Sequence, residues 1–157
     1  MVHKEHLGCV CLKTDTAFRI RRSYSLYYGK KDAEATYSDE IESTEDEFLE
    51  YKSFCSRNNI TCLVYLIPNK IQILRDNMEI ADKYGIPKEK IDFLWPQKHF
   101  IKFFKENNIT YYDLTDEFIN QNNIDSLFLP INGHWSKRGC FIAGNYLGEK
   151  LLSEGKI

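Results

Sequence analysis

The stretch from Thr61 to Ile67, Thr-Cys-Leu-Val-Tyr-Leu-Ile, decides the fold class of this chain. It is an almost unbroken apolar run that ends at Pro68. This pattern is typical of a β-strand that is buried on both faces, as in parallel sheets covered by helices. This run therefore predicts an α/β fold.

A helix is expected directly before this strand. Thr44 and Glu47 have the spacing of a capping box, in which a hydroxyl and a carboxylate each satisfy a free backbone amide. Three apolar residues then recur at helical spacing and form one buried stripe: Phe48, Tyr51 and Cys55. We expect Asn58 and Asn59 to end the helix.

The same pattern, a helix that ends at two asparagines and is followed by a strand, recurs farther along the chain. Pro96 suits a first helical turn, Asn107 and Asn108 end that helix, and a strand resumes over 110–114 (TYYDL). Both units share the tetrapeptide Asn-Asn-Ile-Thr, at 58–61 and 107–110, but their flanks do not match. We interpret them as two helix-to-strand units with one kind of connecting turn. With a helix expected over 74–84, they predict parallel strands joined by crossover helices.

The C-terminal part predicts two more helices. Thr115 is expected to cap a short helix through Ile119, and Ser136 a final helix to about Leu152. The predicted inner face of the final helix has mostly small residues: Cys140, Ala143, Gly144, Leu147, Gly148 and Leu151. Small residues let a helix lie close to a sheet. Close packing would explain Gly144 and Gly148, which each cost roughly 1 kcal/mol relative to Ala in a helix.

Composition excludes several classes of protein. The 157 residues include 21 Lys and Arg against 23 Asp and Glu, for a net charge of -2, so no large basic surface for nucleic acid is expected. The longest charge-free apolar run, 60–68, is far short of the ~20 residues that span a bilayer. The N-terminus lacks a signal-peptide pattern, and the five cysteines lack a secreted framework's spacing, which favours a reducing, cytoplasmic compartment by default.

The N-terminal 42 residues form a poorly defined segment, whereas residues 43–157 carry the α/β pattern. Residues 7–12 are a candidate strand. Residues 19–28 alternate arginines with tyrosines, which suits either contact with an acidic partner or a simple exposed segment. Four potential metal ligands crowd into nine residues, His3, His6, Cys9 and Cys11. Structural zinc sites usually draw their ligands from separated turns, so we expect no metal site and no cofactor.

The sharpest chemical feature is the segment 130–139, Pro-Ile-Asn-Gly-His-Trp-Ser-Lys-Arg-Gly. We expect His134 on a loop that leaves a strand and enters a helix. In open α/β sheets, that edge is where ligands bind. Trp135 could shield the imidazole from water, and Asn69 and Lys70, which follow the first buried strand, could line the same cleft. A loop histidine with a purely structural hydrogen bond is the alternative interpretation.

This block, followed by a helix rich in small residues, resembles the last sequence block of the SGNH (GDSL-type) hydrolase superfamily. The runs 63–70 (LVYLIPNK) and 109–115 (ITYYDLT) are similar to that family's preceding core segments. The resemblance covers about residues 44–152. It implies a three-layer α/β/α fold with a mainly parallel sheet, here expected to be incomplete at the N-terminus. It also implies esterase or acyltransferase activity on a small-molecule, carbohydrate or lipid ester.

Carried over by position, His134 matches the family's general base and Asn132 the aspartate that orients it. Trp135, Asn69 and Lys70 would contact the substrate. The chain departs from the family in two ways, because Asn132 is not ionised and no Gly-Asp-Ser nucleophile turn occurs. An Asp-to-Asn change at the equivalent position of a serine protease lowers turnover about 10⁴-fold. Thr16, in the early turn Thr14-Asp15-Thr16, is a candidate nucleophilic hydroxyl.

The sequence is compatible with three functions. The first is ester hydrolysis or acyl transfer with His134 as general base, impaired by the departures above. The second is a non-catalytic remnant or binding module of the same fold. The third is an interaction protein that uses residues 19–28. A half-domain would also expose sheet edge and apolar surface, so a homo-oligomer is a further expectation.

Overall fold

A computed structural model of the chain describes residues 37–73, 91–130 and 134–156, and these ranges contain helices and two strands. In order they are α3 (Ser38–Arg57), β1 (Leu63–Leu66), α4 (Lys70–Ile73), α6 (Trp95–Glu106), β2 (Thr110–Asp113), α7 (Thr115–Ile119), the 3-10 helix η2 (Ile124–Leu127) and α8 (Lys137–Ser153). The predictions for residues 7–12, 19–28 and 74–84 lie outside the described residues.

The two described strands form a parallel sheet. Leu63 lies opposite Thr110 and Leu66 opposite Asp113. Both strands follow a helix in the chain, and this confirms the general α/β class and the parallel pairing that the apolar runs predict. No helix in the described parts of the chain combines the length and apolar character needed to cross a lipid bilayer.

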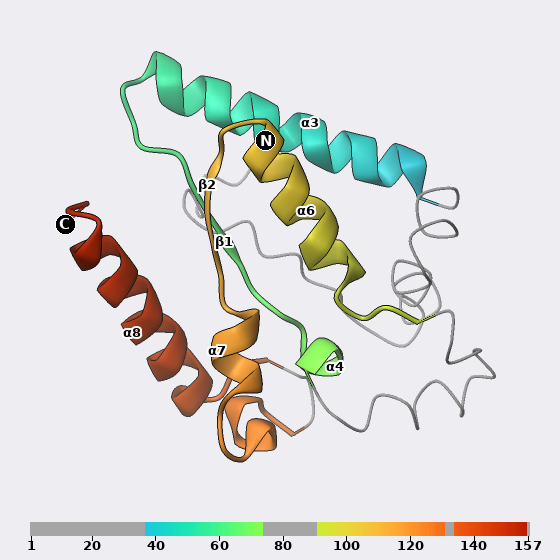
Figure 1. Cartoon of the computed structure of the whole chain (residues 1–157), viewed down its shortest axis with the longest axis vertical. Helices are drawn as coiled ribbons and strands as arrows, with labels where there is room; N and C mark the ends of the chain where they lie inside the picture. The colour runs from blue at the N-terminus through green and yellow to red at the C-terminus, as the bar shows by residue number, and fades with distance from the viewer. Residues whose placement is uncertain (1–36, 74–90, 131–133, 157) are drawn as a thin grey trace, which may run out of the picture.

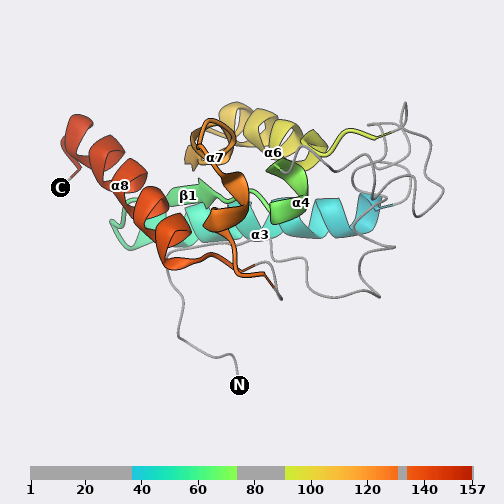
Figure 2. The same cartoon turned by 90° about the horizontal axis from the view of Figure 1, so that it is seen from below.

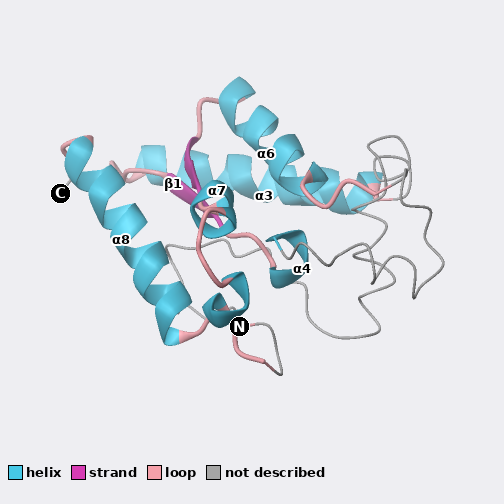
Figure 3. Ribbon diagram, turned by 60° about the horizontal axis from the view of Figure 1, so that its bottom comes forward, coloured by secondary structure: helices cyan, strands magenta, loops and turns pink. Residues whose placement is uncertain are grey.

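Helices cover both faces of this sheet, as Figures 1, 2 and 3 show, with α8 on one side and α3 and α6 on the other. Alternate residues of β1 point to opposite faces. Val64 and Leu66 pack with Phe48 of α3 and the phenylalanines of α6. Tyr65 packs on the other face with Ala143 of α8. The strand is buried on both faces because each face has its own aromatic-rich cluster.

The two Asn-Asn-Ile-Thr segments form the same turn, as predicted. Asn59 and Asn108 both have left-handed backbone, with φ of 55° and 50°. In each turn the isoleucine amide donates to the carbonyl five residues earlier, Ile60 to Cys55 at 2.8 Å and Ile109 to Phe104 at 2.9 Å. This is the Schellman type of helix ending, in which a left-handed residue satisfies otherwise free carbonyls.

The predicted start of the first helix is wrong. Helix α3 begins at Ser38, so Thr44 lies inside it and donates its hydroxyl to the Glu40 carbonyl at 2.7 Å instead of capping the helix. The earlier turn is stabilised by packing, because Ile41 and its neighbour Tyr37 form a small buried cluster with Trp95. A tertiary contact has therefore extended the helix beyond its local capping signal.

Helix α8 begins and ends close to where it is predicted. Ser136 caps it by accepting a hydrogen bond from the Gly139 amide at 3.2 Å. Its predicted inner face is wrong in part, because Cys140 and Gly144 are exposed. The close approach is at Gly139 instead, where a Cβ would overlap the Leu127 carbonyl oxygen. At Gly144 and Gly148 a Cβ would meet none of the described atoms within 4 Å.

Candidate functional site

The carboxyl ends of both strands meet at one edge of the sheet. Strand β1 leads into α4 and β2 leads into α7, and these elements lie together with η2 and the start of α8 at the lower end of the molecule in Figure 1. Lys70 Nζ of α4 makes an ion pair with Asp125 Oδ1 of η2 at 3.2 Å, which joins two of these elements directly. This edge is where an open α/β sheet binds ligands.

His134 lies at this edge with an exposed side chain. Its backbone carbonyl accepts a hydrogen bond from the Leu129 amide at 2.6 Å, and the next residue, Trp135, pairs with Phe128 in an antiparallel bridge. These two contacts close the short loop that leads into α8. The loop leaves the 3-10 helix η2 and not a strand, which differs from the prediction. Asn132, its predicted partner, lies outside the described residues.

Packing and hydrogen bonds of the neighbouring residues fix the backbone next to His134. The Trp135 ring packs on Phe118, with ring centroids 5.3 Å apart, and belongs to the core on the α8 side of the sheet. Ser136 donates to the Ser126 carbonyl at 2.6 Å while it caps α8. Arg138 donates to the Ser126 hydroxyl and to the Asn123 carbonyl. Side chains that alternate along this extended segment therefore point inward at Trp135 and outward at His134.

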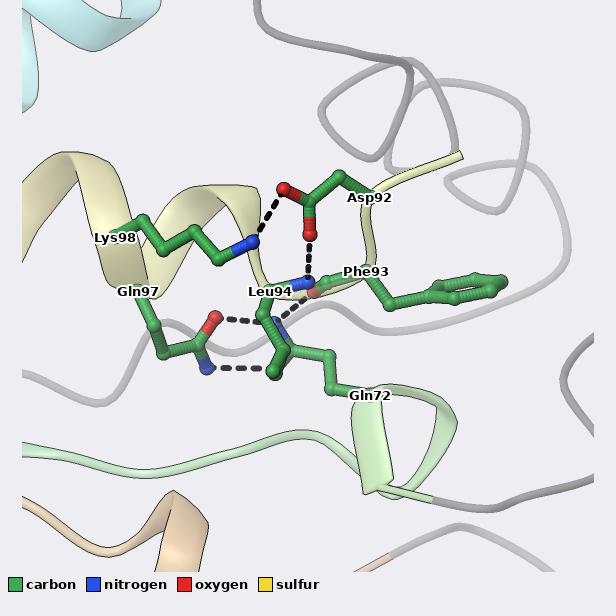
Figure 4. Close-up of polar contacts among 6 residues, drawn as sticks. All are labelled: Gln72, Asp92, Phe93, Leu94, Gln97 and Lys98. Carbon is green, nitrogen blue, oxygen red and sulfur yellow. Dashed lines mark hydrogen bonds and ion pairs between the residues drawn. The ribbon is translucent and has the colours of Figure 1, made fainter. Parts of the chain in front are cut away.

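A buried amide network joins α4, the helix after β1, to α6 and to the Phe93 carbonyl, as Figure 4 shows. The Gln72 amide nitrogen donates to Gln97 at 2.5 Å and to the Phe93 carbonyl at 2.9 Å. Its oxygen accepts from Gln97 at 3.0 Å and from the Asn69 backbone amide at 2.7 Å. All four hydrogen-bonding positions of the Gln72 amide are used, which is what a side chain only 9% exposed requires. The network thereby holds the backbone of the predicted site residue Asn69, next to Lys70.

The sequence contained a signal for one half of this network. Gln97 lies three and seven residues before Phe100 and Phe104, on the buried face of α6. A polar residue on such a face needs a buried partner. The identity of that partner, Gln72, comes from a segment 25 residues away and had no local signal.

Acidic side chains follow β2 at the same edge. Asp113 Oδ1 accepts from the Thr115 amide at 3.0 Å and from its hydroxyl at 2.6 Å. Helix α7 begins at Thr115 itself, with Leu114 in the N-cap position and no side-chain cap, so the predicted capping role of Thr115 is wrong. The pKa of Tyr146 on α8 is raised, mainly by burial and further by the charges of Asp113, Glu117 and Asp116. Acidic side chains at the end of β2 and on α7 therefore lie close enough to Tyr146 of α8 to affect its pKa.

His99 of α6 is mostly covered by its neighbours. Its side chain is 20% exposed, its Nε2 lies 2.8 Å from Glu45 Oε1, and its ring stacks on Trp95 at 5.0 Å. The contact joins α6 to α3. The described residues contain no group of three or more His, Cys, Asp or Glu side chains that could hold a metal ion. The four N-terminal candidates and Thr16 lie outside those residues.

The structure thus brings four of the five predicted site residues to one end of the sheet: His134, Trp135, Asn69 and Lys70. Of these, His134 alone has a side chain classed as exposed. Comparison with protein-family models, with curated proteins and with solved structures found no match to this chain.

Proposed function

We propose that this protein hydrolyses or transfers small acyl esters, of the carbohydrate or lipid class, with His134 as the general base. The observation that supports the proposal is an exposed His134 at the carboxyl edge of a parallel sheet, with its backbone fixed by the Leu129 hydrogen bond and by the bridge of the adjacent Trp135. Helices on both faces of that sheet are compatible with a three-layer SGNH-like fold, which we include in the proposal.

In this mechanism, the His134 imidazole removes the proton from an attacking hydroxyl and later returns it to the leaving group. Asn132 would orient the ring by a hydrogen bond. A neutral amide does not stabilise the imidazolium that forms, so we expect slow turnover. Lys70 and Asn69, positioned by Gln72, would contact the substrate at the same edge. The attacking hydroxyl is left unassigned.

The test is an esterase assay on the full chain with p-nitrophenyl acetate and an acetylated sugar. We expect His134→Gln to lower kcat by at least about 100-fold, the usual contribution of a general base. His99→Gln is the matched control, because it removes the other described histidine from a site that the mechanism does not use. Equal rates in the wild type and in His134→Gln would overturn the proposal.

A non-catalytic binding module is the second candidate, and a specific observation favours it. Three members of the His-Trp block have clear structural roles: Trp135 in the core, Ser136 as the helix cap and Gly139 against Leu127. These structural roles account for the block even in a protein without catalytic activity. This candidate predicts that a sugar or lipid ester protects His134 from modification by diethyl pyrocarbonate without being consumed.

A further inference from the structure

Helix α8 has an outer face that no described element covers. Figures 1 and 3 show α8 at the outside of the molecule, with the other described elements on one side of it. Its inner side is marked by Ala143, which is 3% exposed and belongs to the core. Phe141 and Leu152 lie on the opposite side, because they are two and nine residues from Ala143 in a helix that turns about 100° per residue.

This outer face is apolar. Phe141 is 67% exposed and Leu152 is 64% exposed, more than any other large apolar side chain of the described residues. The segment from Gly139 to Gly148 contains no charged side chain. A helix that covers a sheet normally presents charged and polar residues to solvent, whereas a helix that is apolar on all sides is normally buried. We therefore expect a second protein surface against this face.

The same face combines large side chains with a depression. Phe141, Gly144, Gly148 and Leu152 follow one another at intervals of three or four residues, so they share one stripe of the helix. At Gly144 and Gly148 a Cβ would meet no described atom within 4 Å. The missing side chains leave room for a ring from another helix, as holes receive knobs in coiled coils. The face is therefore complementary in shape to a copy of itself.

We propose that two copies of this chain pair through the outer faces of their α8 helices, in an antiparallel arrangement. With Phe141 of one copy opposite Gly148 of the second, two-fold symmetry places Gly148 of the first copy opposite Phe141 of the second. Lys137 then lies opposite Leu152 at both ends of the pair. Each Phe141 ring fills the depression of the other copy and loses its contact with water.

Charge complementarity favours a second copy as the occupant and determines its direction. Lys137 at the start of α8 and Glu149 near its end are both exposed, and no described residue forms an ion pair with either. The antiparallel arrangement brings Lys137 of each copy within one helical turn of Glu149 of the other. A parallel arrangement would place like charges side by side, which is unfavourable. Lys150, also near this end, lies over the Tyr146 ring instead, 5.5 Å from its centroid.

The pairing should be weak and reversible. Helix α8 has 17 residues and is therefore about 25 Å long. A pair of single helices of this length is at the small end of specific interfaces, below about 1,200 Å² in total, so we expect a dissociation constant in the micromolar range. The inference does not depend on the proposed esterase activity, because the antiparallel pair keeps the two His134 edges at opposite ends.

The test is sedimentation velocity of the full chain, from low micromolar to near-millimolar concentration, with a reducing agent present. We expect the mass to rise from 18.5 kDa toward twice that value. Phe141→Glu should raise the dissociation constant at least about 30-fold, because it places a charge at the centre of an apolar interface. Ile60→Glu is the matched control: it places the same charge on a residue that is 53% exposed outside α8, and should leave pairing unchanged.

Charge reversal tests the direction of the pair. Lys137→Glu and Glu149→Lys should each raise the dissociation constant roughly three- to tenfold at low ionic strength, and the double variant should restore it. Weak pairing in the double variant as well would overturn the antiparallel arrangement. A mass of 18.5 kDa at every concentration would overturn the pairing itself. A dimer that persists in Phe141→Glu would do the same, because its interface would lie elsewhere.

Discussion

The same four residues, Asn-Asn-Ile-Thr, end two helices in this molecule, and only their surroundings differ. The backbone turns agree closely, with left-handed Asn59 and Asn108 and equivalent hydrogen bonds. Yet Ile60 is 53% exposed whereas Ile109 is 4% exposed. The local sequence thus determines the shape of the turn, and the packing of distant elements determines what the turn contributes to stability.

The reason for the difference lies in the helices around each turn. Ile109 packs with Phe48 of α3 and Phe104 of α6, so two helices cover it. The second turn is also held from outside, because Lys52 of α3 donates to the Asn107 carbonyl at 2.7 Å. Ile60 does not belong to any of the described core clusters.

We expect the greatest loss of stability from truncation of Ile109, and almost none from truncation of Ile60. Ile109→Ala should lower the free energy of unfolding by about 2–5 kcal/mol, because it leaves a cavity under two helices. Ile60→Ala should change it by no more than about 0.5 kcal/mol. Urea unfolding followed by tryptophan fluorescence measures both. Similar losses of stability in the two variants would contradict the conclusion that packing gives the two turns different contributions to stability.

Gly139 and Gly144 of α8 are a second pair of identical residues in different surroundings. Gly139→Ala should cost about 1–3 kcal/mol, since its Cβ would overlap the Leu127 carbonyl oxygen. Gly144→Ala should instead stabilise the protein by about 0.5–1 kcal/mol, because nothing described lies within 4 Å of the new methyl group and Ala favours a helix. Thermal unfolding by circular dichroism tests the opposite signs. A loss at position 144 would contradict this assignment.

The two left-handed asparagines should behave alike, in contrast to the isoleucines. Asn59→Ala and Asn108→Ala should each cost about 1–2 kcal/mol, because Ala has the Cβ that is strained at positive φ but lacks the short polar side chain with which Asn can offset that strain by local hydrogen bonds. The glycine variants at the same positions serve as controls and should restore stability. Unequal losses, measured by urea unfolding, would mean that the turn is not set locally.

The smallest effect concerns the tyrosines of the two strands, which are register partners. Tyr65 donates to the Ala143 carbonyl at 2.8 Å, and Tyr112 donates to Glu154 Oε2 at 2.6 Å. Hydrogen bonds from Lys156 and Tyr112 lower the pKa of Glu154 below 4.5, so this contribution is present above pH 4.5 and is lost as the pH falls through the lowered value.

Tyr112→Phe should therefore destabilise the protein at neutral pH by less than about 1 kcal/mol, and the difference from the wild type should shrink in acid. Tyr65→Phe should show a loss that does not change over the same acid range, since a backbone carbonyl does not titrate there. Urea unfolding at a series of pH values distinguishes the two. A Tyr112→Phe loss that is constant with pH would exclude the Glu154 contact.

The sequence also predicted part of the candidate site. The position of His134 before a helix capped by Ser136 follows from local signals, because cap residues and loop histidines are recognisable over ten residues. The frame of that loop was not predictable in the same way. Phe128 and Trp135 pair across a loop, and Lys70 meets Asp125 from 55 residues away, so both depend on how η2 packs against its neighbours.

Local sequence patterns determined the two strands, the helix stops at the paired asparagines and the cap of α8, since apolar runs and end signals act within a few residues. Tertiary structure decided the start of α3, the face that α8 turns to the sheet and the partners of Gln72. Each of these depends on burial by segments that are remote in sequence. The free energy of removing a side chain from water is a property of the folded assembly, and no window of neighbouring residues contains it.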